Sequence, residues 1–241
     1  MYMMNSTQKE EDLWEAALND NETVINMYEG DINAETPLGN TALHIAASGG
    51  CFNVVKALLD KGAKVDCIDK DALTPLFKAV KGGNHEIASL LLNKGADVSI
   101  LDSDGATLLH HAAHKGMTKL VEQLLEKQEV DPQSVDSSGQ LPFHTACSEG
   151  HLDIVKMLLA CDRSQVNCVI DDTKYTPLHE AAFWGRKYVV NFLLENNALI
   201  NPKTSLNETP MTLAKKCGHT YVTELIRSKG GILDGEGNTL S

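Results

Sequence analysis

Aromatic residues and long apolar runs are both scarce in this sequence. Phenylalanine, tryptophan and tyrosine make up 5 % of its 241 residues. No stretch approaches the ~18 consecutive apolar residues that a transmembrane helix requires, so we expect no membrane insertion. Residues 1–12 contain no extended apolar core and end in the acidic run Glu10, Glu11 and Asp12, so we expect no secretory signal either.

Basic residues are outnumbered by acidic ones. The chain has 21 lysines and arginines against 33 aspartates and glutamates, for a formal net charge of -12. Such a surface would repel a polyphosphate, so we expect no nucleic-acid partner. With 42 % hydrophobic and 22 % charged residues, the composition is typical of a folded chain rather than a disordered one.

Cysteine is present but too thinly spread to build a disulfide scaffold. The six cysteines are Cys51, Cys67, Cys147, Cys161, Cys168 and Cys217. Since no secretory signal is expected, we predict reduced thiols and a cytoplasmic location, with the nucleus as an alternative.

Motifs of catalysis are also missing. There is no phosphate-binding glycine loop and no nucleophile-elbow serine. His179 and Glu180 begin like a zinc-protease motif, but the second histidine is absent. His111 and His114 lie three residues apart on one predicted helix face, and two metal ligands rarely suffice without a third. We therefore expect no enzyme activity, no cofactor and no metal.

What the sequence does contain is an internal repeat. Six segments of the form Thr-Pro-Leu-His or a variant begin 33, 33, 34, 35 and 33 residues apart. Their first residues are Thr41, Thr74, Thr107, Leu141, Thr176 and Thr209. A small-residue pair or its variant, a glycine and a recurring apolar pattern follow each segment, except that the apolar pattern is broken in the last. A fixed period of this length indicates stacked structural units.

Each recurring feature has a physical role. Threonine caps a helix, and proline suits the next position because no amide is needed there. The small pair allows two helices to approach closely, and the glycine ends the first helix in a left-handed conformation. The apolar residues form one wide stripe on a second helix, which only a neighbouring unit can bury.

These motifs resemble those of the ankyrin-repeat family over residues 8–229. Asp102–Gly105 and Asp136–Gly139 match its hairpin motif, and Leu13–Ala17 begins a seventh, shorter unit. The resemblance implies an all-α repeat solenoid of stacked helix-turn-helix units with β-hairpin-like loops. Residues 1–7 are expected to form an N-terminal tail, and residues 230–241 a flexible, acidic and glycine-rich one.

The terminal units are expected to present polar outer faces and to close the solenoid as caps. Glu29 replaces a leucine in the first unit, and Thr223 and Arg227 replace apolar residues in the last. These replacements favour a complete, self-capped solenoid. Thr36–Gly39 mimics the Thr-Pro-Leu-His motif at the wrong spacing, and we place it in a loop.

Several positions depart from the family pattern. Leu141 replaces the capping threonine, which should weaken that helix start by ~1 kcal/mol. Phe77 and Thr212 replace the histidine that bonds nearby backbone in the family, so we expect weaker local order there. Ala72 and Lys174 replace the hairpin glycine and tolerate positive φ less well than Asn207 does, so those two turns are expected to differ in shape. Two connections are longer than the rest, and Cys161–Gln165 is interpreted as a surface insertion rather than a functional loop.

The family resemblance implies that the chain binds another protein through its hairpin tips and first helices, on the concave side. We predict a protein–protein interaction module, acting as an adaptor or scaffold and monomeric when alone. The alternative is a regulatory or assembly-chaperone subunit of a larger enzyme complex.

Two clusters on the predicted binding face are the candidate contact sites. The aromatic cluster comprises Tyr175, Glu180, Phe183 and Trp184, and the basic cluster comprises Lys70, Lys78, Lys81, His111, His114 and Lys115. Aromatic side chains are typical anchors of interfaces, although they would also serve to pack over a neighbouring repeat. The basic cluster favours an acidic partner segment next to an apolar one, and its alternative is a plain solvated face.

Overall fold

The computed structural model describes residues 6–234, which fold into seven helix pairs. These pairs form two compact units, unit 1 (Met1–Val130) and unit 2 (Asp131–Ser241). Within residues 6–234 the only β-type pairing is an isolated bridge between Leu101 and Thr107. The predicted all-α repeat architecture is therefore confirmed.

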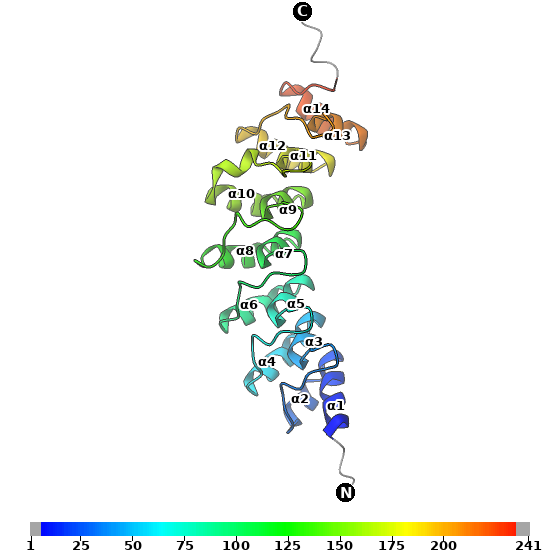
Figure 1. Cartoon of the computed structure of the whole chain (residues 1–241), viewed down its shortest axis with the longest axis vertical. Coiled ribbons are helices and arrows are strands. Elements are labelled where there is room, and N and C mark those ends of the chain that lie inside the picture. The colour runs from blue at the N-terminus through cyan, green and yellow to red at the C-terminus, as the bar shows by residue number, and fades with distance from the viewer. Residues whose placement is uncertain (1–5, 235–241) are drawn as a thin grey trace, which may run out of the picture. The chain divides into compact units, whose positions relative to one another are not determined.

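Unit 1 contains four helix pairs, each a first helix, a short turn and a second helix (Figure 1). They are α1 (Ser6–Leu18) with α2 (Glu22–Met27), α3 (Ala42–Gly49) with α4 (Phe52–Asp60), α5 (Pro75–Lys81) with α6 (His85–Asn93), and α7 (Leu108–His114) with α8 (Thr118–Leu125). The first helices stack in the order α1, α3, α5, α7, and the second helices form a parallel layer.

Unit 2 contains three helix pairs and one short 3-10 helix. They are α9 (Pro142–Glu149) with α10 (Leu152–Cys161), η1 (Arg163–Asn167), α11 (Pro177–Phe183) with α12 (Lys187–Glu195), and α13 (Pro210–Lys216) with α14 (Thr220–Ser228). Helix α11 packs between α9 and α13, and α12 packs between α10 and α14.

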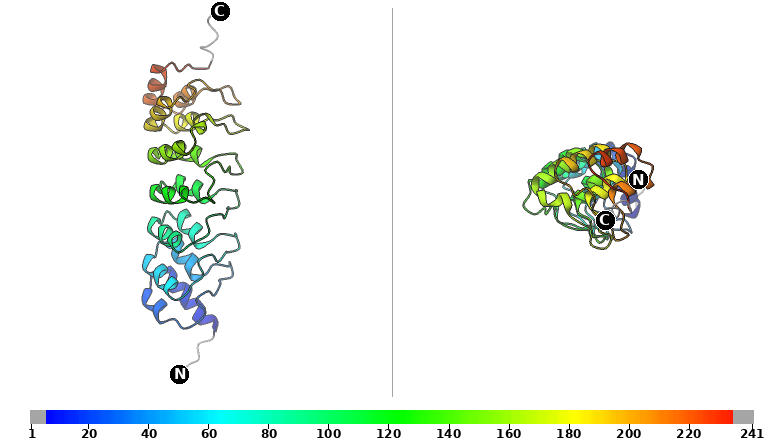
Figure 2. Two further views of the ribbon diagram at one scale, coloured as in Figure 1. Left: turned by 90° about the vertical axis from the view of Figure 1, so that its left-hand side faces the viewer. Right: turned by 90° about the horizontal axis from the view of Figure 1, so that it is seen from above.

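A loop joins each helix pair to the next, and within each unit these loops project on one side of the helices (Figure 2). We call the loop tips together with the first helices the hairpin face. The apolar stripe of the second helices lies on the other side of each first helix, as with the fully buried Val54, Val55 and Leu58 of α4. The first helices also bury one side against each other, and their remaining side chains, with the loop tips, are the exposed part of the hairpin face.

No helix in the described part of the chain is long and apolar enough to cross a membrane.

All six cysteines are free thiols.

The turn at Ala72 keeps the family geometry, so the expectation of a different shape is wrong there. Ala72 adopts φ 58°, and its amide donates to the carbonyl of Asp69 at 3.0 Å. The glycine turn of the next repeat makes the same bond, from Gly105 to Asp102 at 2.9 Å. The turn at Lys174 does differ, because its amide donates four residues back, to Ile170.

The helix starts that lack consensus residues are also formed. Phe77 is fully buried in α5, and Thr212 bonds Thr209 through their hydroxyls at 3.1 Å. Both positions are thus ordered, contrary to expectation. At Leu141 no side chain caps the helix, but its carbonyl accepts the amide of His144 at 3.0 Å, so α9 still begins there.

The chain ends are packed more closely than the sequence predicts. Helix α1 begins at Ser6, within the predicted tail of residues 1–7. Thr209 donates its hydroxyl to the carbonyl of Ile232 at 2.7 Å and its amide to Asp234 at 3.0 Å. Residues 230–234 therefore lie against α13, whereas residues 1–5 and 235–241 fall outside the described residues.

Three residues were expected to give the terminal repeats a polar surface, and this prediction is wrong for Thr223. It is buried at 5 % exposure, and its hydroxyl donates to the carbonyl of His219 at 3.0 Å. A hydroxyl that bonds its own helix backbone can be buried without loss. Glu29 and Arg227 are exposed.

The longer connection after α10 is only partly a surface insertion. Arg163 and Ser164 are exposed, but Gln165 and Val166 of η1 are buried. Neither amide atom of Gln165 has a hydrogen-bond partner among residues 6–234. The segment is therefore anchored in unit 2 rather than projecting from it.

Replacing Ala72 by glycine should raise the free energy of unfolding by about 0.5–1 kcal/mol. A left-handed residue with a β-carbon costs roughly 1–2 kcal/mol, and the added flexibility of glycine in the unfolded chain offsets about half of that. Chemical denaturation measures the change. Ala57→Gly, in the middle of α4, is the control and should destabilise by about 1 kcal/mol. A loss of stability in Ala72→Gly would contradict the assigned backbone conformation.

Candidate functional site

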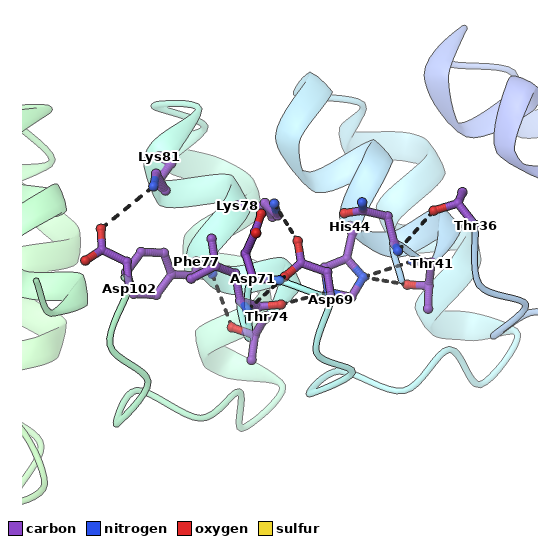
Figure 3. Close-up of polar contacts among 12 residues, drawn as sticks. Thr36, Thr41, His44, Asp69, Asp71, Thr74, Phe77, Lys78, Lys81 and Asp102 are labelled. Atoms are coloured by element: carbon purple, nitrogen blue, oxygen red, sulfur yellow. Dashed lines mark hydrogen bonds and ion pairs between the residues drawn. The ribbon is translucent and has the colours of Figure 1, made fainter. Parts of the chain in front are cut away.

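A buried histidine joins each of several repeats to the next one. The amide of Thr41 donates to Nδ1 of His44 at 3.1 Å, so the proton of the neutral ring lies on Nε2. That nitrogen lies 3.0 Å from the carbonyl of Leu73, in the following hairpin loop, and donates to it (Figure 3). The first helix and the next hairpin loop are thereby held in one register.

The same link recurs in unit 2. Thr176 donates its amide to Nδ1 of His179 at 3.1 Å, and Nε2 lies 3.1 Å from the carbonyl of Glu208. Burial lowers the pKa of His179 to about 4, so the ring stays neutral near pH 7. His144 differs, because its Nε2 faces the thiol of Cys168 at 3.5 Å. These histidines thus have the structural role that the repeat pattern indicates.

Part of the basic cluster of unit 1 is bonded to two aspartates of the hairpin loops. Nζ of Lys78 lies 2.6 Å from Oδ2 of Asp69, whose side chain is only 1 % exposed. The other oxygen of Asp69 accepts the amides of Asp71 and Leu73 at 3.0 and 2.9 Å (Figure 3). Burial raises the pKa of Asp69, but the bonds from Lys78 and the amides lower it by more, so it remains ionised.

Asp102 repeats this arrangement one unit further along. Its Oδ2 lies 2.7 Å from Nε2 of His111 and 3.7 Å from Nζ of Lys81, while Oδ1 accepts the amides of Asp104 and Ala106. Burial raises the pKa of Asp102, and the bonds from His111 and the amides lower it overall. Burial lowers the pKa of His111 and Asp102 partly opposes this, so a neutral ring donates Nε2–H to the carboxylate.

Three of the six predicted basic residues therefore hold the hairpin loops in place. The ammonium groups of Lys78 and Lys81 and the Nε2–H of His111 face the carboxylate of Asp69 or Asp102, whose side chains are buried. Lys70 and Lys115 are exposed and form no ion pair with the described residues, and His114 is exposed. No group of three or more metal-ligating side chains occurs in residues 6–234.

Asp69 and Asp102 were missed as interaction residues, although they open the hairpin motif. The signal was available: an aspartate stands nine residues before Lys78 and before His111. In the other repeats the residue nine positions after the equivalent loop residue is not basic. For example, Thr145 stands nine residues after Asp136.

The aromatic cluster lies on the hairpin face of unit 2. The Phe183 and Trp184 rings meet edge to face at 5.1 Å, and the Tyr175 ring lies 5.4 Å from that of His179. Tyr175 and Phe183 are half-buried, whereas Trp184 is 52 % exposed. Packing within the repeats therefore explains part of the placement of Tyr175 and Phe183, and it explains least of the placement of Trp184.

Glu180 is the electrostatic exception on this face. Its side chain is half-buried, Trp184 follows it by one helical turn at the end of α11, and no basic side chain of the described residues forms an ion pair with it. Burial raises its pKa to about 7, and the nearby Trp184 side chain only partly offsets that rise. The nearby Glu208, by contrast, is paired with Lys216.

Sequence reasoning missed a second aromatic group in unit 2, at the starts of the second helices. Tyr188 and Tyr221 are exposed, and Nζ of Lys187 lies 4.7 Å and 5.6 Å from their ring centroids. Both tyrosines lie on second helices, whereas the predicted binding face consisted of first helices and loop tips. In a chain with so few aromatic residues, their presence alone was a signal.

Replacing Glu180 by glutamine should stabilise the protein at alkaline pH. The pKa of Glu180 is about 7 in the folded protein against an ordinary 4.5, so the unfolded chain loses its proton first. Stability is therefore lost as pH rises from 4.5 to about 7, by about 1–3 kcal/mol. Thermal unfolding should show Glu180→Gln above wild type at about pH 8 and level with it at about pH 4.

The control is Glu195→Gln, an exposed position on α12. It should show no such pH-dependent difference. An equal effect of the two variants would contradict the half-buried, unpaired state of Glu180.

Stacked helix pairs joined by hairpin loops define a repeat protein. The family model for ankyrin repeats, three copies, matches residues 13–102, 83–169 and 109–204. The chain belongs to the ankyrin-repeat family. Ankyrin repeats generally mediate protein–protein interaction.

Several proteins are similar to this chain. The Ankyrin repeat protein nuc-2 of Neurospora crassa is 32 % identical over 130 residues, covering 53 % of this chain and 12 % of that protein. The human transient receptor potential cation channel subfamily A member 1 is 30 % identical over 207 residues, covering 84 % of this chain and 16 % of the channel. This chain therefore spans only a small part of either relative.

A shorter relative and one solved structure are similar too. The probable 26S proteasome regulatory subunit p28 of Saccharomyces cerevisiae is 36 % identical over 97 residues, or 39 % of this chain and 42 % of p28. The crystal structure of the human ASB11 ankyrin repeat domain matches with a TM-score of 0.75 and 27 % identity, covering 91 % of this chain and 98 % of that domain.

Proposed function

We propose that this chain is a protein-binding adaptor or scaffold that contacts its partner through the hairpin face of its repeats. The observation that carries the proposal is the half-exposed Trp184 in unit 2, whose ring meets that of Phe183 edge to face at 5.1 Å. Tryptophan is enriched among the few residues that dominate binding energy, and a rigid repeat presents it with little loss of entropy.

Exposed basic side chains of unit 1 are a second proposed contact. Lys70, His114 and Lys115 lie on the hairpin face of that unit. They suit the acidic partner segment predicted from the sequence, with fewer charges than the full cluster would offer because Lys78 and Lys81 are paired. Surface charges of this kind mainly raise the rate of association.

The remaining features of the proposal follow from composition and family. A net charge of -12 argues against a nucleic-acid partner, and we propose a cytoplasmic or nuclear protein that is monomeric alone. No residue is proposed as catalytic.

A second candidate function is a regulatory or assembly subunit of a larger enzyme complex. One observation favours it: the 36 % identity over 97 residues to a protein named as a probable proteasome regulatory subunit. A captured partner that is part of an enzyme, with its activity changed on binding, would support this second function over a passive scaffold.

The proposal predicts that Trp184→Ala loses partner binding while the protein stays folded. Capture from a lysate of the source cells should show a partner retained by wild type and reduced at least about tenfold on the variant, since hot-spot truncations cost 2 kcal/mol or more. Tyr188→Ala is the matched control, an exposed aromatic on a second helix. Equal retention by wild type and Trp184→Ala would contradict Trp184 as the anchor, and loss in Tyr188→Ala alone would move the site to the second helices.

A further inference from the structure

The first helix pair exposes apolar side chains at positions that every later repeat covers. Val24, the third residue of α2, is 37 % exposed, and Met27, the sixth, is 76 % exposed. The third residue of every later second helix is at most 2 % exposed, namely Val54, Ile87, Leu120, Ile154, Val189 and Val222. The sixth residue of each of these helices is buried or half-buried.

In the later repeats the helix pair that precedes them covers these two positions. Helix α4 packs on α2, and α14 packs on α12. Val222 of α14 is buried although no helix follows α14 among the described residues, so its cover does not come from a later repeat. The third and sixth positions are therefore stacking positions, and on α2 they are apolar and open to solvent.

A groove lies between α1 and α2 on this face, and we call it the end groove. It consists of two adjoining hollows of about 310 and 430 Å³, and both are lined by Asp12 and Val24. The end groove combines apolar and acidic lining residues, namely Ala16, Val24 and Met27 with Asp12, Glu15 and Glu29.

The charge of this repeat defines which partner is complementary to the groove. Residues 6–35 contain nine acidic residues and one lysine, a net charge of -8, against -12 for the whole chain. Glu15 and Glu29 are exposed and form no ion pair with the other described residues. Such a field repels phosphate groups and acidic proteins, and it attracts a basic segment.

We infer that the end groove binds a helix of a partner protein that carries an apolar ridge flanked by lysine or arginine. A helix satisfies its own backbone hydrogen bonds, so it can lay an apolar face into a groove of this kind. Helices also fill the equivalent position in every later repeat. The flexible thioether of Met27 adapts to the shape of such a ridge. This surface is separate from the aromatic and basic clusters, so the inference goes beyond the proposed function and does not depend on it.

The test is a selection on the whole chain from a phage-displayed library of helical peptides with randomised surface positions. Selected peptides are synthesised, labelled and titrated into wild type and its variants by fluorescence anisotropy. The ε-methyl NMR resonance of Met27 reports the end groove, and that of Met211, which is buried in α13, is the internal reference.

We expect selected peptides to shift the Met27 resonance but not that of Met211, and to carry lysine or arginine beside apolar residues three and four positions apart. Met27→Lys should weaken their binding at least about tenfold, as the loss of a central contact does. The matched control is Leu206→Lys, an apolar side chain of unit 2 that is 77 % exposed, and it should bind as wild type does.

The acidic residues of the groove are tested separately. Glu15→Gln combined with Glu29→Gln should weaken binding about twofold to tenfold, because exposed ion pairs contribute modestly. The control is Glu122→Gln combined with Glu126→Gln, two exposed carboxylates of α8 and its C-terminus. A rise in salt from about 0.05 to 0.5 M should weaken binding to wild type, and it should have less effect on the Glu15 and Glu29 variant.

Three results would overturn the inference. The first is that no selected peptide shifts the Met27 resonance, and the second is that the peptides which shift it are neutral or acidic. The third is that wild type alone self-associates in sedimentation and Met27→Lys abolishes this, which would make a second copy the occupant. None of them bears on the hairpin face, which Trp184→Ala tests on its own. Circular dichroism and thermal unfolding establish that each variant is folded.

Discussion

The hydrogen bonds of the buried histidines are the constraint on which the repeat geometry depends. In His44 one ring nitrogen accepts the amide of Thr41 and the other donates to the carbonyl of Leu73 in the next hairpin loop. His179 does the same between its own helix start and Glu208. Because both nitrogens are used, each helix start is tied to the loop that follows it. These bonds hold each such hairpin loop in register with the helix start before it.

The fold could be predicted from the sequence because equivalent positions recur in every repeat. Each sequence pattern is therefore seen several times. The turn at Ala72 was harder, since propensity disfavours a left-handed alanine, yet the bonds around Asp69 hold it there. Thr223 was assigned to the surface by its polarity, and its bond to the helix backbone allows burial instead. In both cases local hydrogen bonding outweighed the preference of the single residue.

The candidate site was less predictable, because a list of positions on one face says nothing about how their side chains pair. Lys78 belongs to the hairpin face by position, but it is bonded to Asp69, nine residues earlier in the chain. Glu180 was predicted beside the aromatic residues, and only its half-buried side chain without an ion pair sets it apart from the other carboxylates of that face. Charge pairing changes the relative weight of the two clusters. Lys78, Lys81 and His111 of unit 1 are bonded to aspartates, whereas Glu180 of unit 2 has no ion pair among the described residues.

The central claim is that Glu180 is a half-buried carboxylate with no ion pair among residues 6–234. A pH titration of its side-chain carboxyl carbon by NMR, assigned through Glu180→Gln, measures this without any partner. The account predicts a midpoint near the pKa of about 7. A midpoint at or below the ordinary value of 4.5 would show that Glu180 is solvated or already paired, and it would contradict the account.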